Sequence, residues 1–232
     1  MDDIKAEGKL LNALLAELAG ELHTRNALHA KLAGELHLLS ALLAELAGEL
    51  HSLLKGKDRK KLSQPERRVF VRSAFATIEA EVYVMKQMAV SWHPGLKWRP
   101  TISEAERAFA QEHEYRLTDS GDVETRRAKI SLEANLRFAF KLLAKAGSVP
   151  SELDVSGSEW QSFRRAIKIR DRITHPKSVS DLNISDEDYN EVTAGLRWIV
   201  VSHIKLGTAI MLKAKSEAEI VTAMIQAKSE AE

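Results

Sequence analysis

The stretch SQPERRVFVRSAFATIEAEVYVMKQMAVSW, residues 63–92, sets the expected fold class of this chain. Its opening Ser-Gln-Pro-Glu is typical of a helix start. The serine and glutamate side chains can accept hydrogen bonds from the free N–H groups of the first turn, and proline has no N–H to leave unpaired there. Apolar residues then recur at spacings of three and four. This spacing predicts an amphipathic helix that runs to about Trp92. Its apolar face consists of Phe70, Ala74, Ile78, Val82, Met85 and Ala89.

Two glutamates, Glu79 and Glu81, interrupt an otherwise apolar part of this helix. Glu79 lies one turn from Phe75 and Tyr83, so an inward orientation is one interpretation. The interpretation that we favour is a glutamate that faces solvent or pairs with an arginine.

The rest of the body also has helical patterns, separated by turn signals. Ser103 with Glu106 forms a capping box, and Ser158 with Gln161 forms another. Ser185 and three acids, Asp186, Glu187 and Asp188, open the last body helix, where negative charge suits the helix dipole. No segment alternates at period two for long enough to predict a strand. We therefore expect an all-α fold, an antiparallel bundle of four to five helices over residues 63–210. After the first helix, further helices are expected at about 103–115, 123–146, 158–170 and from 185 onward. Turns or loops are expected at 92–100, 118–122 and 147–157.

The N-terminal segment, residues 1–54, contains a tandem repeat with a period of 14 residues. The units begin ALLAELAGELH, ALHAKLAGELH and ALLAELAGELH, and their leucines alternate at spacings of four and three. Fourteen residues are two heptads, so the pattern predicts a helical, coiled-coil-like arm. Arg25 and His29 are polar seam positions, which leaves open one long helix or two helices with a turn. The repeated histidines His23, His37 and His51 would lie about 21 Å apart along a helix and cannot share one ion.

Two further segments flank the body. Residues 55–62 include the charged run KGKDRKK, which is interpreted either as a solvated linker or as a basic patch that helps to hold RNA. Residues 211–232 contain AKSEAE twice, with a period of 13, and are expected to form a helical tail.

Composition excludes several classes of function. The chain has no cysteine, so thiolate metal sites, disulfides and a cysteine nucleophile are excluded. The net charge is +1 over 232 residues, so a polyanion would have to meet a local patch rather than a global field. No apolar run approaches the roughly 20 residues of a membrane span, and the N-terminus does not resemble a signal peptide. We expect a soluble, cytoplasmic protein that uses no metal or other cofactor and no membrane.

The sequence RDRITHP, residues 170–176, combines an arginine, a carboxylate and a histidine at the end of a predicted helix. Histidine titrates near neutral pH and serves as a general acid or base. A guanidinium offers paired donors to phosphate oxygens. Arg170 and His175 are separated by four residues, and a polar residue, Asp171, follows the arginine directly. The alternative is a surface arginine paired to an acid and a histidine that covers the helix end.

This pattern resembles the Arg-x4–6-His signature of the HEPN superfamily. The likeness covers about residues 63–210, and the motif stands before the last body helix, as it does in that family. The resemblance implies a helical bundle and a metal-independent endoribonuclease, or a relative that only binds RNA. It also implies a homodimer in which two motifs face each other. Asp171 departs from the asparagine common in the family and would compete with phosphate for Arg170.

On this resemblance, Arg170 would hold the phosphate, His175 would act as acid or base, and Asp171 would orient one of them. Arg172 and Lys177 would enlarge the RNA-binding rim. The expected function is then RNA-directed, as in a toxin–antitoxin or phage-defence ribonuclease with an antitoxin partner. The alternative is a non-catalytic structural or interaction protein, whose helical bundle and coiled-coil arm assemble partners.

Overall fold

The computed structural model describes residues 62–91, 102–151 and 153–229, together with the single residues Gly34, Ala41, Glu45 and Gly48. Those four residues are helical. The predictions for the rest of the repeat arm, for the linker 55–61 and for the loop 92–100 lie outside the described residues.

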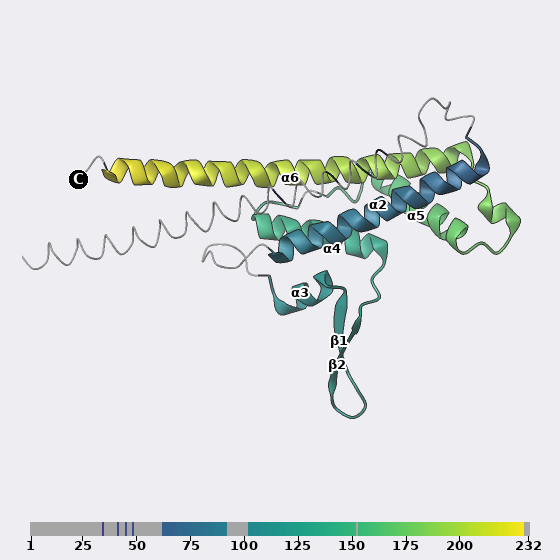
Figure 1. Ribbon diagram of the computed structural model, residues 1–232, viewed down its shortest axis with the longest axis horizontal. Helices are drawn as coiled ribbons and strands as arrows, with labels where there is room; N and C mark the ends of the chain where they lie inside the picture. Colours follow the sequence, from purple (N-terminus) through teal and green to yellow (C-terminus); the bar gives the residue numbers. More distant parts are fainter. Residues whose placement is uncertain are drawn as a thin grey trace, which may run out of the picture.

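The described part of the chain is mainly helical, as the sequence predicts (Figure 1). Helix α3 begins after Ser103, whose side chain and Glu106 form the predicted capping box. The second predicted capping box is wrong, because α5 is capped by Gly157 and Ser158 lies inside the helix. The elements are α2 (Gln64–Ser91), α3 (Glu104–Ala110), β1 (His113–Leu117), β2 (Val123–Arg127), α4 (Leu132–Gly147), α5 (Ser158–Thr174), the 3-10 turn η2 (Val179–Leu182) and α6 (Asp186–Ser229).

The all-α bundle is formed by α2, α4, α5 and α6, but its helices do not all alternate in direction. Helix α5 runs antiparallel to α6: Arg172 pairs with Asp188, and farther along Phe163 meets Gly195. By contrast, α2 runs parallel to α6, since Gln64 bonds Ile184 and Glu81 bonds His203. Gly147, at the end of α4, meets Ile210, so α4 also points along α6. The predicted antiparallel order is therefore correct for α5 and wrong for α2.

A β-hairpin replaces the ends of two predicted helices. Strands β1 and β2 pair antiparallel, from His113 opposite Arg127 to Leu117 opposite Val123. The predicted turn at 118–122 is confirmed as its tip, where Gly121 has a φ of +87°. Most hairpin side chains are exposed, so the sequence has no alternating apolar pattern that would predict these strands. The hairpin projects from the body below α3 and α4 (Figure 1).

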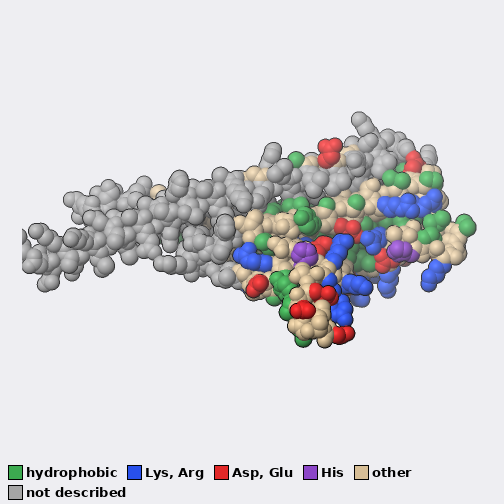
Figure 2. Space-filling model, turned by 60° about the horizontal axis from the view of Figure 1, so that its bottom comes forward, with side chains coloured by type: hydrophobic (Ala, Val, Ile, Leu, Met, Phe, Trp, Pro, Cys, Tyr) green, Lys and Arg blue, Asp and Glu red, His purple; other side chains and the backbone are tan. Residues whose placement is uncertain are grey.

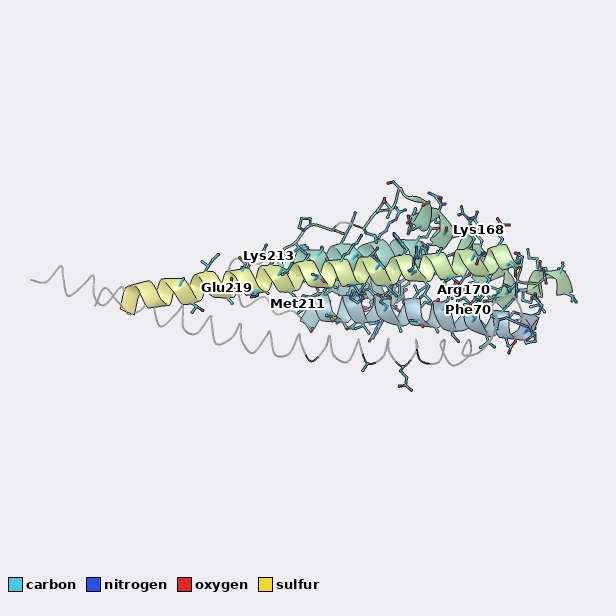
Figure 3. All side chains as sticks on the ribbon, turned by 90° about the horizontal axis from the view of Figure 1, so that it is seen from above. Phe70, Lys168, Arg170, Met211, Lys213 and Glu219 are labelled. Carbon is cyan, nitrogen blue, oxygen red and sulfur yellow. The ribbon has the colours of Figure 1, made fainter. Side chains whose placement is uncertain are left out.

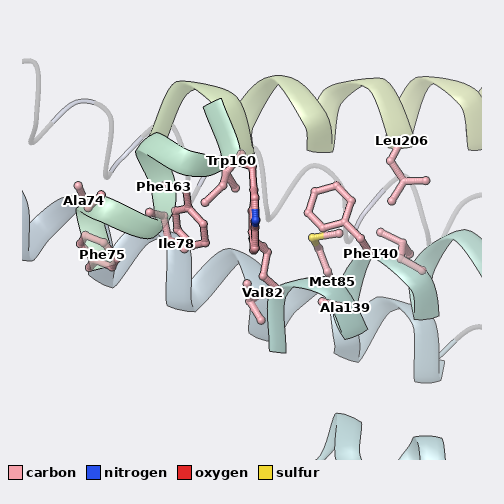
Figure 4. Close-up of a cluster of buried hydrophobic side chains, with 14 of the residues drawn as sticks. Ala74, Phe75, Ile78, Val82, Met85, Ala139, Phe140, Trp160, Phe163 and Leu206 are labelled. Atoms are coloured by element: carbon pink, nitrogen blue, oxygen red, sulfur yellow. The ribbon is translucent and has the colours of Figure 1, made fainter. Parts of the chain in front are cut away.

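The core lies between the four long helices. Trp160 is 2% exposed and belongs to an aromatic cluster with Phe163 and Trp198, whose ring centroids lie 5.5 to 5.8 Å apart. Figure 4 shows this core between α2, α4, α5 and α6, with Met85 of α2 beside Ala139 and Phe140 of α4. Gly195 allows a close approach of α6 to α5, because an added Cβ would lie only 3.0 Å from the Phe163 Cα.

A carboxylate and a histidine, Glu81 and His203, form a hydrogen-bonded pair in the core. Glu81 is fully buried, and its Oε1 lies 2.6 Å from Nδ1 of His203, which is 6% exposed. The other oxygen, Oε2, is buried without a hydrogen-bond partner among the described residues. Of the two glutamates that interrupt the apolar stretch, Glu81 is therefore the one that enters the core.

Helix α6 is much longer than the body that it packs on, and it continues unbroken into the predicted C-terminal tail (Figure 1). By length and composition alone, the part from Asp186 to Ile220 could cross a membrane, which the sequence analysis did not expect. A core helix of a soluble protein passes the same test. Helix α6 places Val192, Ile199 and Leu206 in the bundle core, which is consistent with a soluble chain.

Candidate functional site

Arg170 lies near the end of α5, facing α2. Its Nη2 donates to Oε1 of Glu79 at 2.5 Å, and its Nη1 donates to Oδ1 of Asp171 at 3.0 Å. The guanidinium carbon also lies 5.9 Å from the centre of the Phe75 ring. The arginine-paired interpretation of Glu79 is thus confirmed. Figure 3 places Arg170 between α6 and α2, with Phe70 farther along α2.

His175 ends the helix that carries Arg170. Its N–H donates to the Asp171 carbonyl at 2.9 Å, and the hydroxyl of Thr174 donates to the Arg170 carbonyl at 2.7 Å. These bonds satisfy carbonyls of the last turn, and Pro176 then prevents continuation. The His175 side chain is exposed, and so is Asp171. An imidazole in this position is free to meet a ligand or a second molecule.

The two basic residues of the expected rim differ in their surroundings. Arg172 donates to the Asn183 carbonyl at 2.9 Å and to Asp188 at 2.8 Å, so it ties the loop after α5 to the start of α6. Burial raises the pKa of Asp188, but hydrogen bonds from Arg172 and Ser185 outweigh it and hold that pKa below its ordinary value. Lys177 is exposed, and its backbone N–H donates to Asp181 at 2.8 Å, which leaves its ammonium group without a hydrogen bond to any residue that the structure describes. Lys177 is therefore the better placed of the two for an external phosphate.

A polar hollow of about 300 Å3 surrounds the Arg170 guanidinium; we call it the arginine hollow. Four separate parts of the chain form it: α2, α5, the base of the hairpin and the start of α4. Figure 2 shows Lys and Arg side chains gathered with Asp and Glu beside the hairpin. Its lining residues are Glu79, Glu112, Arg127, Ala128, Ile130, Leu132, Asn135 and Arg170.

Arg127, Glu112 and Asn135 are site residues that the sequence did not indicate. The hairpin brings Arg127 to the hollow, where its Nη2 donates to Glu112 at 3.1 Å. Burial raises the Glu112 pKa, but hydrogen bonds from Lys86 and Arg127 outweigh it, so the net shift is downward. Asn135 Oδ1 is buried without a partner in the described part of the chain. An unsatisfied buried acceptor is costly, so a ligand hydroxyl or amino group there would be favourable.

The charges of the arginine hollow come close to cancelling. Arg127 and Arg170 oppose Glu79 and Glu112, and Asp171 adds a negative charge beside Arg170. These pairs are partly exposed, with 32% of the Arg170 side chain and 46% of Glu79 accessible. Half-exposed pairs are worth little, on the order of 0–1 kcal/mol, so a phosphate can replace a carboxylate at low cost. The hollow can bind a phosphate if Arg170 exchanges Glu79 or Asp171 for a phosphate oxygen.

Arg170 and His175 do not line the same hollow. Five residues of helix rotate the side chain by about 500°, so the two residues point to faces about 140° apart. His175 is not among the residues that line the arginine hollow.

The described residues contain no group of three or more His, Asp or Glu side chains that could hold a metal ion. Comparisons with protein-family models, with curated proteins and with solved structures find no match to this chain.

Proposed function

We propose that this chain is an HEPN-type protein that acts on RNA, with Arg170 as the phosphate-binding residue and His175 as the acid or base. The observation that supports it best is the position of the motif. Arg170 lines a surface hollow beside a second arginine, Arg127, and His175 stands exposed at the end of the same helix, directly before the last helix of the bundle. Because α2 does not alternate with its neighbours, the proposal depends on the motif and its surroundings rather than on the helix order.

The chemistry follows from the residue types. The 2′-hydroxyl of RNA attacks the adjacent phosphorus, a base removes the hydroxyl proton, and an acid protonates the leaving 5′-oxygen, which leaves a cyclic phosphate. His175 can take the first or the second role. Arg170 stabilises the charge that develops on the phosphorane oxygens. In this proposal two copies of the chain are needed, so that the histidine of one meets the arginine of the other, and the chain works as a cytoplasmic homodimer.

The experiment is cleavage of a mixed RNA pool in EDTA across pH 6 to 8. Wild type should cut and leave cyclic phosphate ends, and both Arg170→Ala and His175→Ala should lose activity. His113→Ala and Arg164→Ala are matched controls, since these residues are exposed and lie outside the motif. The absence of cleavage by wild type excludes the catalytic role. Equal loss in the control variants would show that the motif is not the site.

A second function, assembly of partners without catalysis, is favoured by a different observation. Helix α6 exposes apolar side chains on the face opposite to its buried one, among them Ile204, Met211 and Leu212, each between 59% and 63% exposed. Figure 1 shows α6 extending past α2, α4 and α5. Sedimentation of the wild type beside Ile204→Glu/Leu212→Glu tests it: a loss of oligomer in the variant supports assembly through α6, and an unchanged state contradicts it.

A further inference from the structure

A second hollow lies between α6, α4, the loop that precedes α5 and the first turn of α5. None of the motif residues lines it. It measures about 500 Å3, and we call it the α6 groove. In Figure 4, Phe140 and Leu206 lie together between α4 and α6. The apolar lining residues are Phe140, Pro150, Leu153, Trp198, Val201, Leu206 and Ala209, and the polar ones are Asp154, Glu159, Arg197, Ser202 and Lys205.

The floor of the α6 groove is apolar and fixed. Leu206 is 7% exposed, and Trp198 is held by the aromatic cluster with Trp160 and Phe163. Phe140 is 2% exposed and belongs to the bundle core. A concave apolar floor with a few polar groups at its rim is the usual form of a small-molecule site.

The two acids at the rim stand on the loop before α5 and in the first turn of α5, not on α6. Asp154 Oδ1 accepts hydrogen bonds from the Ser156 hydroxyl and N–H and from the Gly157 N–H, at 2.7, 2.8 and 3.1 Å. These bonds lower the pKa of Asp154. Glu159 lies in the first turn of α5, where the helix dipole favours a negative charge. Asp154 therefore stays ionised, and its charge is held by its own loop on the side of the groove away from the α6 residues.

The two cations at the rim, Arg197 and Lys205, both stand on α6. Arg197 and Lys205 are exposed on α6, and among the described residues neither lies within ion-pair distance of a carboxylate. Residues 192–216 contain Arg197, Lys205, Lys213 and Lys215 and no aspartate or glutamate. The wall of the groove formed by α6 therefore has a positive potential next to an apolar floor.

Both cations can reach one anion. Arg197 and Lys205 each stand four residues from Val201, which is about 6 Å along the helix axis, within the span of their long side chains. We propose that the α6 groove binds a small amphipathic carboxylate, with its hydrocarbon on Phe140, Trp198 and Leu206 and its carboxylate between Arg197 and Lys205. This inference is independent of the function proposed for RNA, because it uses none of the residues of the motif.

The test is titration of the full chain with octanoate, followed by calorimetry and by the Trp198 indole N–H signal, which Trp198→Phe assigns. Octan-1-ol, with the same hydrocarbon and no charge, is the matched probe. We expect saturable binding of one octanoate per chain and at least about tenfold weaker binding of octan-1-ol, which corresponds to about 1.4 kcal/mol.

Variants locate the site. Arg197→Gln/Lys205→Gln should weaken octanoate binding at least about tenfold. Lys129→Gln/Lys168→Gln changes the net charge equally at exposed positions away from the groove and should leave binding unchanged. Three outcomes overturn the proposal: no saturable binding, equal affinity for octan-1-ol, or equal weakening in both double variants.

Discussion

Replacing His203 by leucine would remove the partner of a carboxylate that the core encloses. Glu81 is fully buried, and 2.6 Å separates its Oε1 from His203 Nδ1. Breaking a buried pair on one side leaves an uncompensated polar group, so His203→Leu should lower the free energy of unfolding by about 3–5 kcal/mol. Glu81→Leu leaves an imidazole unpaired and should cost about 1–3 kcal/mol. The double variant, with two apolar side chains, should be about as stable as wild type or more stable.

Urea unfolding measures these differences, with tryptophan fluorescence as the signal because Trp160 is 2% exposed in the folded core. The exposed histidine of β1 provides a control, since His113→Leu should change the free energy by less than about 0.5 kcal/mol. If His203→Leu costs less than about 1 kcal/mol, or if the two single effects simply add in the double variant, the pair is not a coupled buried pair.

Three further predictions concern the site and the fold. Glu79→Gln should tighten RNA binding roughly fourfold, because it removes a negative charge about 5 Å from the phosphate, which is worth about 0.8 kcal/mol in water. Fluorescence anisotropy compares it with Glu133→Gln, which frees Arg164 instead and should leave RNA binding unchanged. Gly195→Ala should lower the free energy of unfolding by about 1–3 kcal/mol through the Phe163 backbone, whereas Gly207→Ala, with nothing within 4 Å of its Cβ, should raise it by about 0.5–1 kcal/mol, as urea midpoints will show. Asp188 has a lowered pKa in the folded chain, so its contribution to stability is present above the ordinary value of about 3.9 and is lost as the pH falls through the folded value; Asp188→Asn should therefore lose less stability than wild type between pH 7 and about pH 3.

The sequence predicted the helices whose apolar spacing is regular. Helix α2 begins after Ser63 and buries the predicted face, and α5 and α6 also lie close to their predicted positions. The hairpin was missed because its strands are exposed on both faces and are stabilised by cross-strand pairs such as Glu114 with Arg126, at 2.6 Å. Such pairs form only after the strands are in register, so no local pattern in the sequence indicates them.

The candidate site was predictable only where it is local. Arg170, Asp171 and His175 stand within one stretch of sequence. Asp171, which we expected to compete with phosphate for Arg170, accepts a hydrogen bond from it at 3.0 Å. Arg127 and Asn135 come to the same hollow through the hairpin and the start of α4. Their arrival depends on tertiary packing between segments far apart in the chain, which spacing along the sequence cannot express. The direction of α2 relative to α6 also depends on tertiary packing, so the sequence pattern did not predict it.

The most direct test of the central claim is equilibrium binding of a short, 2′-O-methylated single-stranded RNA, which binds but cannot be cleaved, over a range of salt concentrations. We expect the logarithm of the affinity to fall linearly with the logarithm of the salt concentration. Arg170→Ala should weaken binding and reduce that slope by about 0.7, one phosphate contact, while Arg164→Ala leaves both unchanged. Binding that is absent, independent of salt or unaffected by Arg170→Ala would contradict the claim that this chain acts on RNA through Arg170.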